Sequence, residues 1–279
     1  MPPPDERGLD GVLMTTEDGY DEVPSFRLDG RLAIITGASE GIGRAFALAY
    51  SQAGAEVVLV SRRREKLLEV ERSVEGAGGK AHVVCADLSK IDDIRSLSQT
   101  VETIGHGTDL KLVLINNAGF AFTKPALDIT EEDWNRVLDL HAKGTFFCSQ
   151  LIGRQMISRK YGKIINLSST WAVSTDTGKS IYGAAKASVS YLTAALSTEW
   201  APKGVRVNAI APCATLSENT QLHMRQNPAR TERLLTKIKL GRFPDPVDLL
   251  GAAIFLGSSA SDFVTGQTLF VDGGWRAAG

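Results

Sequence analysis

Tyr182 and Lys186 are the two side chains of this sequence best suited to move a proton. They lie four residues apart in a segment with helical spacing, so they share one face of the expected helix. A free tyrosine has a pKa of about 10 and is a poor base at neutral pH. A neighbouring ammonium favours the phenolate and lowers that pKa. Alone, such a pair is common on surface helices, so its chemistry depends on the elements that position it.

Those elements alternate between apolar strands and amphipathic helices from Arg31 onward. Strands that are near-continuous apolar runs, each followed by a helix, indicate a parallel sheet buried on both faces. We therefore expect an α/β fold, a single doubly wound parallel sheet of the Rossmann type with helices on both faces and ligands at the carboxyl ends of its strands. The expected strands are RLAIITG, AEVVLVSR, KAHVVCADLS, KLVLINNAG, GKIINLSS, VRVNAIAP and QTLFVDGG, and residues 131–158 are expected to form one long helix.

Composition excludes several other functions. The 279 residues carry a net charge of −1, so no overall field attracts nucleic acid or an anionic membrane. Three distant cysteines and four scattered histidines predict neither a disulfide framework nor a metal site. No run is apolar enough to span a bilayer, and the start lacks the pattern of a signal peptide. We expect a cytoplasmic protein with an acidic N-terminal extension, residues 1–27, and one domain, residues 28–279.

A glycine-rich loop joins the first expected strand to the first helix. Gly37, Gly41 and Gly43 follow Thr36, and glycines at such a turn let the backbone approach a pyrophosphate at the positive end of a helix. A lone glycine pattern is weak evidence, and its position between strand and helix strengthens it.

The order of further motifs resembles the short-chain dehydrogenase/reductase family from about Leu28 to Trp275. The motifs that carry this resemblance are Thr36-Gly37-x-x-x-Gly41-x-Gly43, Asn116-Asn117-Ala118-Gly119, Ser169, Tyr182-x-x-x-Lys186, Arg206-Val207-Asn208, Pro212, Thr265-Gly266-Gln267 and Val271-Asp272-Gly273-Gly274. The resemblance implies hydride transfer between a nicotinamide cofactor and a small carbonyl or hydroxyl substrate. Tyr182 would exchange the proton, Lys186 would lower its pKa, and Ser169 rather than Ser168 would bind the substrate oxygen. It also implies a homo-oligomer, typically a tetramer.

The same resemblance implies a cofactor site along the strand ends. At the end of the second strand the chain has Ser61 and Arg62 where an acidic residue would select NAD(H), so we expect NADP(H), with NAD(H) as the alternative. Glu40 complicates this preference, because a carboxylate near the 2′-phosphate costs affinity. The expected cofactor-binding residues are Gly37, Ser39, Gly41, Ile42, Gly43, Ser61, Arg62, Asp87, Leu88, Asn116, Ala118, Gly119, Tyr182, Lys186, Pro212, Thr215 and Ser217.

Two positions depart from the family pattern. His141 stands where an asparagine usually holds a water chain behind the lysine, so it is either a space-filling residue that holds the same water or a titrating relay. Cys213 follows Pro212 where the family commonly has glycine, and a buried inert thiol is the simpler interpretation. These departures keep a second hypothesis open, a catalytically silent protein that binds the cofactor, against which the intact Ser169, Tyr182 and Lys186 argue.

The segment 218–242 is the expected lid over the substrate. A basic lid suits an anionic substrate such as a sugar acid or an acyl thioester, and the alternative is a solvated helical insert. Its charged residues are His223, Arg225, Arg230, Arg233, Lys237, Lys239 and Arg242, against Glu218 and Glu232. The phrases TEWAP and VTGQTLFVDGGW resemble gluconate 5-dehydrogenases and 3-oxoacyl-carrier-protein reductases, a likeness that does not determine the substrate.

Overall fold

The computed structural model describes residues 23–278, without the side chains of Glu218, Asn219, His223 and Ala278. Seven strands form one parallel sheet in the order β3-β2-β1-β4-β5-β6-β7, which confirms the doubly wound prediction. The strands are β1 Arg31–Thr36, β2 Glu56–Ser61, β3 Ala81–Cys85, β4 Lys111–Asn116, β5 Gly162–Leu167, β6 Val205–Pro212 and β7 Thr268–Val271. Residues 23–27 precede the sheet without regular structure and are exposed, whereas Leu28 is fully buried. The remainder of the expected N-terminal extension, residues 1–22, lies outside the described residues.

Nine α-helices surround the sheet within residues 23–278. They are α1 Gly41–Gln52, α2 Arg64–Gly76, α3 Ile91–Gly105, α4 Glu131–Leu138, α5 Thr145–Ser158, α6 Ser180–Trp200, α7 Glu218–Gln226, α8 Pro228–Leu235 and α9 Leu250–Gly257. A π-helical segment, η3 Asp139–Gly144, joins α4 to α5, so the expected long helix is continuous but widened at its middle. Short 3₁₀ turns occur at η2 Ala126–Asp128, η4 Thr170–Ala172, η5 Ala201–Lys203, η6 Pro246–Leu249, η7 Ser259–Ser261 and η8 Arg276–Ala278.

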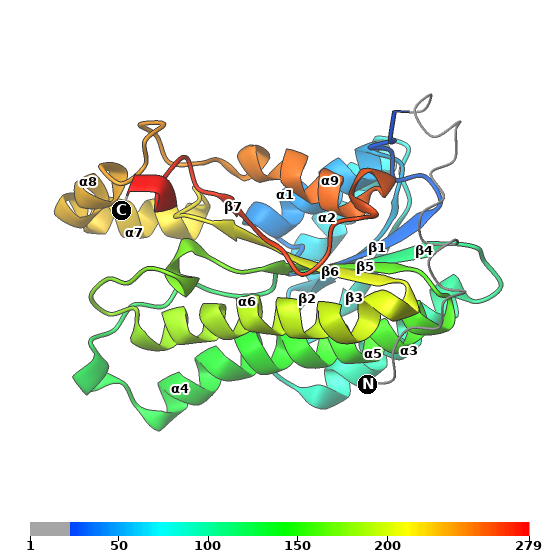
Figure 1. Ribbon diagram of the computed structural model, residues 1–279, viewed down its shortest axis with the longest axis horizontal. Helices are drawn as coiled ribbons and strands as arrows, with labels where there is room; N and C mark the ends of the chain where they lie inside the picture. Colours follow the sequence, from blue (N-terminus) through cyan, green and yellow to red (C-terminus); the bar gives the residue numbers. More distant parts are fainter. Residues whose placement is uncertain (1–22, 279) are drawn as a thin grey trace, which may run out of the picture.

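Two apolar layers hold the helices to the sheet, one on each face. Residues of α1, α2 and α9 pack on one face, where Phe46 and Tyr50 are fully buried. Residues of α3, α5 and α6 pack on the other, around Leu97 and Ile152. Figure 1 shows these two layers above and below the sheet, with α7, α8 and the C-terminus gathered at one end of it. A parallel sheet requires helices on both sides, since both of its faces are apolar.

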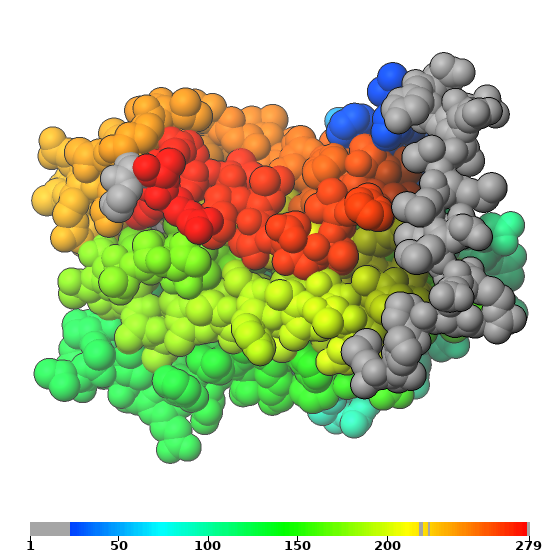
Figure 2. Space-filling view, in the orientation of Figure 1, coloured from blue at the N-terminus to red at the C-terminus, as the bar shows by residue number. Residues whose placement is uncertain are grey.

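The C-terminal segment closes this end of the molecule. In Figure 2 it lies, in red, between the orange residues of the lid segment and the yellow-green residues of α6. Trp275 is buried there and meets Trp171 edge-on, with ring centres 5.4 Å apart. The C-terminal segment is therefore packed against the turn η4 that follows β5. Within residues 23–278, no helix combines the length and apolar character needed to cross a bilayer.

Candidate active site

Ser169, Tyr182 and Lys186 meet beyond the carboxyl end of β5. Ser169 begins the turn η4, accepts a hydrogen bond from the Trp171 amide at 3.2 Å and also hydrogen-bonds to Tyr182. Ser168 instead donates to the Lys186 carbonyl at 3.1 Å and pairs with Ser190 at 2.7 Å. The structure thus brings Ser169, and not Ser168, to the tyrosine, as the spacing predicts.

Burial dominates the electrostatics of this trio. Burial raises the pKa of Tyr182 to about 12, and the hydrogen bond with Ser169 only partly opposes it. Burial also lowers the pKa of Lys186 to about 8. Its ammonium donates to the Leu167 carbonyl at 2.6 Å and lies 5.9 Å from the centre of the Tyr182 ring. Burial of the phenol is therefore the largest influence on the Tyr182 pKa, and the lowering of that pKa by Lys186 stays a prediction.

His141 projects from the π-helical segment toward the same tyrosine. Its ring meets that of Tyr182 edge-on at 5.4 Å, and its Nε2 lies 3.1 Å from the Phe120 carbonyl. Burial, reinforced by the charge of Lys186, holds the pKa of His141 well below 6.5. His141 is therefore neutral near neutrality, which favours a space-filling role over a titrating relay. Its Nδ1 is buried and has no hydrogen-bond partner among residues 23–278, so it is able to hold a water.

The glycine loop has the shape of a pyrophosphate cradle. Gly37 and Gly41 have φ of +69° and +54°, which L residues rarely adopt. A Cβ on Gly43 would lie 2.1 Å from the Gly37 carbonyl oxygen. The loop is tied to β4, where the Asn117 side chain donates to the Thr36 carbonyl at 2.8 Å. These constraints bring bare backbone to the N-terminus of α1, which fits a dinucleotide phosphate.

A cluster of charges flanks this cradle at the end of β2. Arg63 reaches back to the loop, where it donates to Ser39 at 2.9 Å and pairs with Glu40 at 2.7 Å. Lys66 pairs with the same Glu40 carboxylate at 3.2 Å. The predicted Arg62 is instead 75% exposed and lies 3.9 Å from Asp87. Ser61 accepts a hydrogen bond from the Arg63 amide at 3.0 Å. The arginine that meets the glycine loop is thus Arg63.

The other expected cofactor residues divide into two groups. The Asn116 side chain points into a buried network, donating to Ser149 and Asn166 at 2.9 Å each. Thr215 likewise donates back to the Cys213 carbonyl at 3.2 Å. The other group lies at the carboxyl ends of the strands: the loop residue Ile42, Asp87 and Leu88 after β3, Ala118 and Gly119 after β4, Pro212 at the end of β6, and Ser217, which precedes α7 and stands opposite Gly41.

The lid carries its charges mainly outward. Arg225, Arg233, Lys239 and Arg242 are exposed, whereas Arg230 is partly buried. The side chains of Glu218 and His223 lie outside the described residues. Cys213 is buried, and burial raises the pKa of its thiol to about 12, which agrees with an inert cysteine. Lys237 is also partly buried, with its ammonium 5.2 Å from the centre of the Trp275 ring. The solvated-face interpretation therefore holds for most of the lid, with Arg230 and Lys237 as the exceptions.

The hydroxyl of Thr36, the first residue of the glycine-loop motif, accepts hydrogen bonds from the amides of Asn117 and Ala118, at 2.9 and 3.0 Å. Two residues of this region were not identified from the sequence. Lys66 and Lys179 are isolated lysines whose sequence context carries no signal. Only the fold brings Lys66 to the glycine loop and Lys179 to the tyrosine, where its ammonium lies 5.1 Å from the ring centre.

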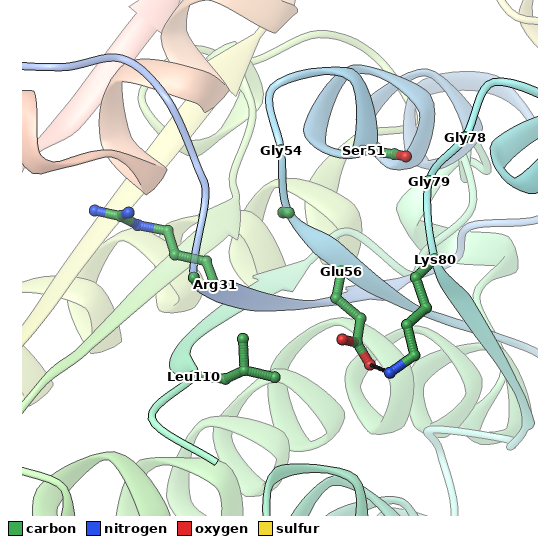
Figure 3. A pocket seen from close by; sticks show the side chains of 10 residues that line it. Arg31, Ser51, Gly54, Glu56, Gly78, Gly79, Lys80 and Leu110 are labelled. Carbon is green, nitrogen blue, oxygen red and sulfur yellow. Dashed lines mark ion pairs between the residues drawn. The ribbon is translucent and has the colours of Figure 1, made fainter.

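A pocket lies at the opposite end of the sheet, by the amino ends of the strands. It measures about 300 Å³ and is lined by residues such as Arg31, Glu56 and Lys80. Figure 3 shows the Glu56 and Lys80 side chains joined across it, at 2.9 Å. None of the expected site residues lines it, and within residues 23–278 no group of His, Cys, Asp and Glu could hold a metal ion. The chemistry is therefore assigned to the carboxyl end of the sheet.

Comparison with known proteins gives concordant results. A family model described as Enoyl-(Acyl carrier protein) reductase matches residues 37–276. The 2-dehydro-3-deoxy-D-gluconate 5-dehydrogenase of Escherichia coli (strain K12) is 37% identical over 258 residues, covering 91% of this chain and 98% of that protein. The 3-oxoacyl-(acyl-carrier-protein) reductase of Thermotoga maritima is 34% identical, with coverage of 89% and 98%. The structure of a gluconate 5-dehydrogenase from Burkholderia cenocepacia J2315, in complex with NADP and tartrate, is 34% identical and superimposes with a TM-score of 0.85, covering 91% of this chain and 98% of that chain.

Proposed function

Because the chain belongs to the short-chain dehydrogenase/reductase family of oxidoreductases, we propose that it transfers a hydride between NADP(H) and a small substrate at a carbonyl or hydroxyl carbon. The relatives act on sugar acids and on 3-oxoacyl groups, and both substrate classes fit a site of this kind. The observation that carries the proposal is the meeting of Tyr182 with Ser169 and Lys186 beside the glycine cradle.

The preference for NADP(H) is supported by the charges at the end of β2. Ser39, Arg63 and Lys66 converge on one point beside the loop, where a hydroxyl and two cations would bind a 2′-phosphate. Glu40 occupies the same point and neutralises part of that charge. The structure of the Burkholderia gluconate 5-dehydrogenase contains NADP, which agrees with this preference. The bound cofactor would supply or accept the hydride at the substrate carbon.

In the reduction direction, the protein's own groups handle the proton. Ser169 donates a hydrogen bond to the substrate oxygen and orients it. Tyr182, whose pKa of about 12 keeps it protonated, gives its proton to that oxygen as negative charge develops there. Lys186, with a pKa of about 8, is mostly protonated at neutral pH and is placed to restore the tyrosine proton through water. His141, whose Nδ1 has no partner among the described residues, would hold that water. The carbonyl thus gains a hydride at carbon and a proton at oxygen.

The test is turnover with a panel of oxo acids, acyl thioesters and neutral ketones, with NADPH and NADH compared. We expect Tyr182→Phe to lower kcat by about 10²–10⁴-fold, the usual contribution of a general acid. The matched control is Tyr191→Phe on the same helix, since Tyr191 is 76% exposed. Cofactor binding without turnover on the entire panel would instead support the silent, cofactor-binding alternative. A clear preference for NADH would remove the NADP(H) assignment.

We further propose a cytoplasmic homotetramer. Two observations support further association: β7 is the edge strand, with Leu269 40% exposed, and Phe263 before it is fully exposed. Light scattering coupled to size-exclusion chromatography tests the assembly, and a monomer at micromolar concentration would overturn it.

A further inference from the structure

Lys179 is a buried cation in contact with the catalytic tyrosine. It precedes α6, is 8% exposed, and its ammonium lies 5.1 Å from the centre of the Tyr182 ring. That ammonium donates to the Phe122 carbonyl at 2.7 Å and to the Thr123 hydroxyl at 2.8 Å. The rest of the ammonium faces the rings of Tyr182 and Trp171, and no carboxylate forms an ion pair with it in the part of the chain that the structure describes. The proton transfer assigned above does not require this lysine.

Arg230 brings a second cation to the same place from α8. Its Nη2 donates to Asp176 at 3.3 Å, and its Nε is buried without a hydrogen-bond partner among the described residues. Arg233 shares the same carboxylate at 2.8 Å. Buried polar groups are normally hydrogen-bonded, and a buried charged donor without an acceptor is costly. The unpartnered Nε of Arg230, beside a Lys179 ammonium that no described carboxylate pairs with, therefore indicates a missing anionic partner.

The local charge balance agrees with this conclusion. Asp176 supplies the carboxylate beside three cations, Lys179, Arg230 and Arg233. Its side chain is 9% exposed and forms ion pairs with both arginines. Burial and the charge of Arg230 lower the pKa of Lys179 to about 8, against the opposing effect of Asp176. The nearby Asp133 does not relieve the excess, because it pairs with Lys124.

Space for an anion lies beside the two arginines, and Lys179 reaches its wall through Thr123. A pocket of about 460 Å³ is lined by Arg230 and Arg233 of the lid, by Thr123, which accepts from Lys179, and by Gly178. We propose that Lys179 and Arg230 bind the carboxylate of the substrate, which makes the substrate a short oxo or hydroxy acid. The inference rests on the proposed function and refines it. Since Lys179 touches both the pocket wall and the Tyr182 ring, the carboxylate would be only a few carbons from the reacting carbonyl.

The test compares each oxo acid with its uncharged primary amide as substrates. Lys179→Met and Arg230→Gln remove the two charges at similar side-chain length, and Lys239→Gln makes the same change at an exposed lid position. We expect the first two variants to lower kcat/KM for the acid by about 10- to 100-fold, the value of a charge-assisted hydrogen bond, and to leave the amide nearly unchanged. Lys239→Gln should match the wild type on both substrates.

A second measurement does not depend on turnover. Tartrate, a small dicarboxylate, is titrated calorimetrically into the protein saturated with NADP, and its affinity should fall in Lys179→Met and Arg230→Gln. Loss of this binding in a protein that turns over no substrate would retain the anion site and reject the proposed function. Two results would reject the anion site while the oxidoreductase function stands. One is an equal loss of kcat/KM for acid and amide in the variants. The other is a thioester substrate that is preferred over every acid and whose turnover Lys179→Met does not change. If the thermal transition shows that Lys179→Met does not fold, Arg230→Gln on the lid is used for the same comparison of acid and amide.

Discussion

The ammonium of Lys179 lies closer to the centre of the Tyr182 ring, at 5.1 Å, than does that of Lys186, at 5.9 Å. Lys186 follows Tyr182 by one helical turn, whereas Lys179 arrives from the loop before the helix. Two buried cations thus lie beside one tyrosine. We assign proton supply to Lys186 and anion binding to Lys179, because their surroundings differ.

Lys186 should impose an alkaline limit on reduction. Burial disfavours its charged form and lowers its pKa to about 8, so the ammonium loses its proton above that pH. We expect kcat for an uncharged ketone to fall as pH rises through about 8, since the neutral amine no longer restores the tyrosine proton. The measurement is a pH–rate profile at saturating substrate. Lys179→Met is the control, because the pKa of Lys179 is also about 8, and its profile should keep the same alkaline limb. A rate that stays flat to about pH 10 would contradict the role of Lys186.

His141→Asn should leave the pH dependence unchanged. Burial keeps the imidazole neutral at neutral pH, so its removal withdraws no titrating group from the working range. Superimposable pH–rate profiles of the wild type and His141→Asn are expected, whereas a lost acidic limb would restore the relay hypothesis. His141→Ala should behave differently, since the ring fills space against Gly119 and Tyr182. We expect that truncation to reduce the free energy of unfolding by about 2–4 kcal/mol, measured by denaturant titration.

The preference for NADPH over NADH should depend on Arg63 and Glu40. Arg63→Ala removes the guanidinium bonded to Ser39 and should lower the ratio of kcat/KM for NADPH over NADH by about 10-fold or more. Glu40→Gln removes a carboxylate from the same point and should raise that ratio by a few fold. The matched control is Arg64→Ala at the exposed start of α2, which should leave the ratio near that of the wild type. Arg62→Ala separates the two assignments: a larger effect there than at Arg63 would favour the residue predicted from the sequence.

Gly43→Ala should abolish cofactor binding. The new Cβ would lie 2.1 Å from the Gly37 carbonyl oxygen, and neither backbone segment can yield while Asn117 ties the loop to β4. The loop must therefore open, with a loss of thermal stability and of NADPH fluorescence enhancement. Gly76→Ala is the control, because a Cβ at Gly76 meets nothing within 4 Å. Unchanged NADPH affinity in Gly43→Ala would show that the glycine loop is not the cofactor cradle.

The sequence by itself was sufficient for the architecture. Apolar runs with glycine at their ends predict the seven strands, and the parallel sheet follows because each run is separated from the next by a helical pattern. The pairing of Tyr182 with Ser169 was expected from the resemblance to the family, and the structure brings the two side chains together. These features depend on local spacing and on the burial of apolar faces, both of which can be followed along a chain.

Tertiary structure decided the electrostatics. The pKa of Tyr182 rises because burial of the phenol outweighs its hydrogen bond with Ser169. Arg63 rather than Arg62 meets the glycine loop, because the direction of a side chain after β2 depends on its partners Ser39 and Glu40. Lys179 and Arg230 converge from positions 51 residues apart, a meeting that no spacing rule predicts. Burial and long-range proximity arise only when the chain is folded, and they determine the charge state of this site.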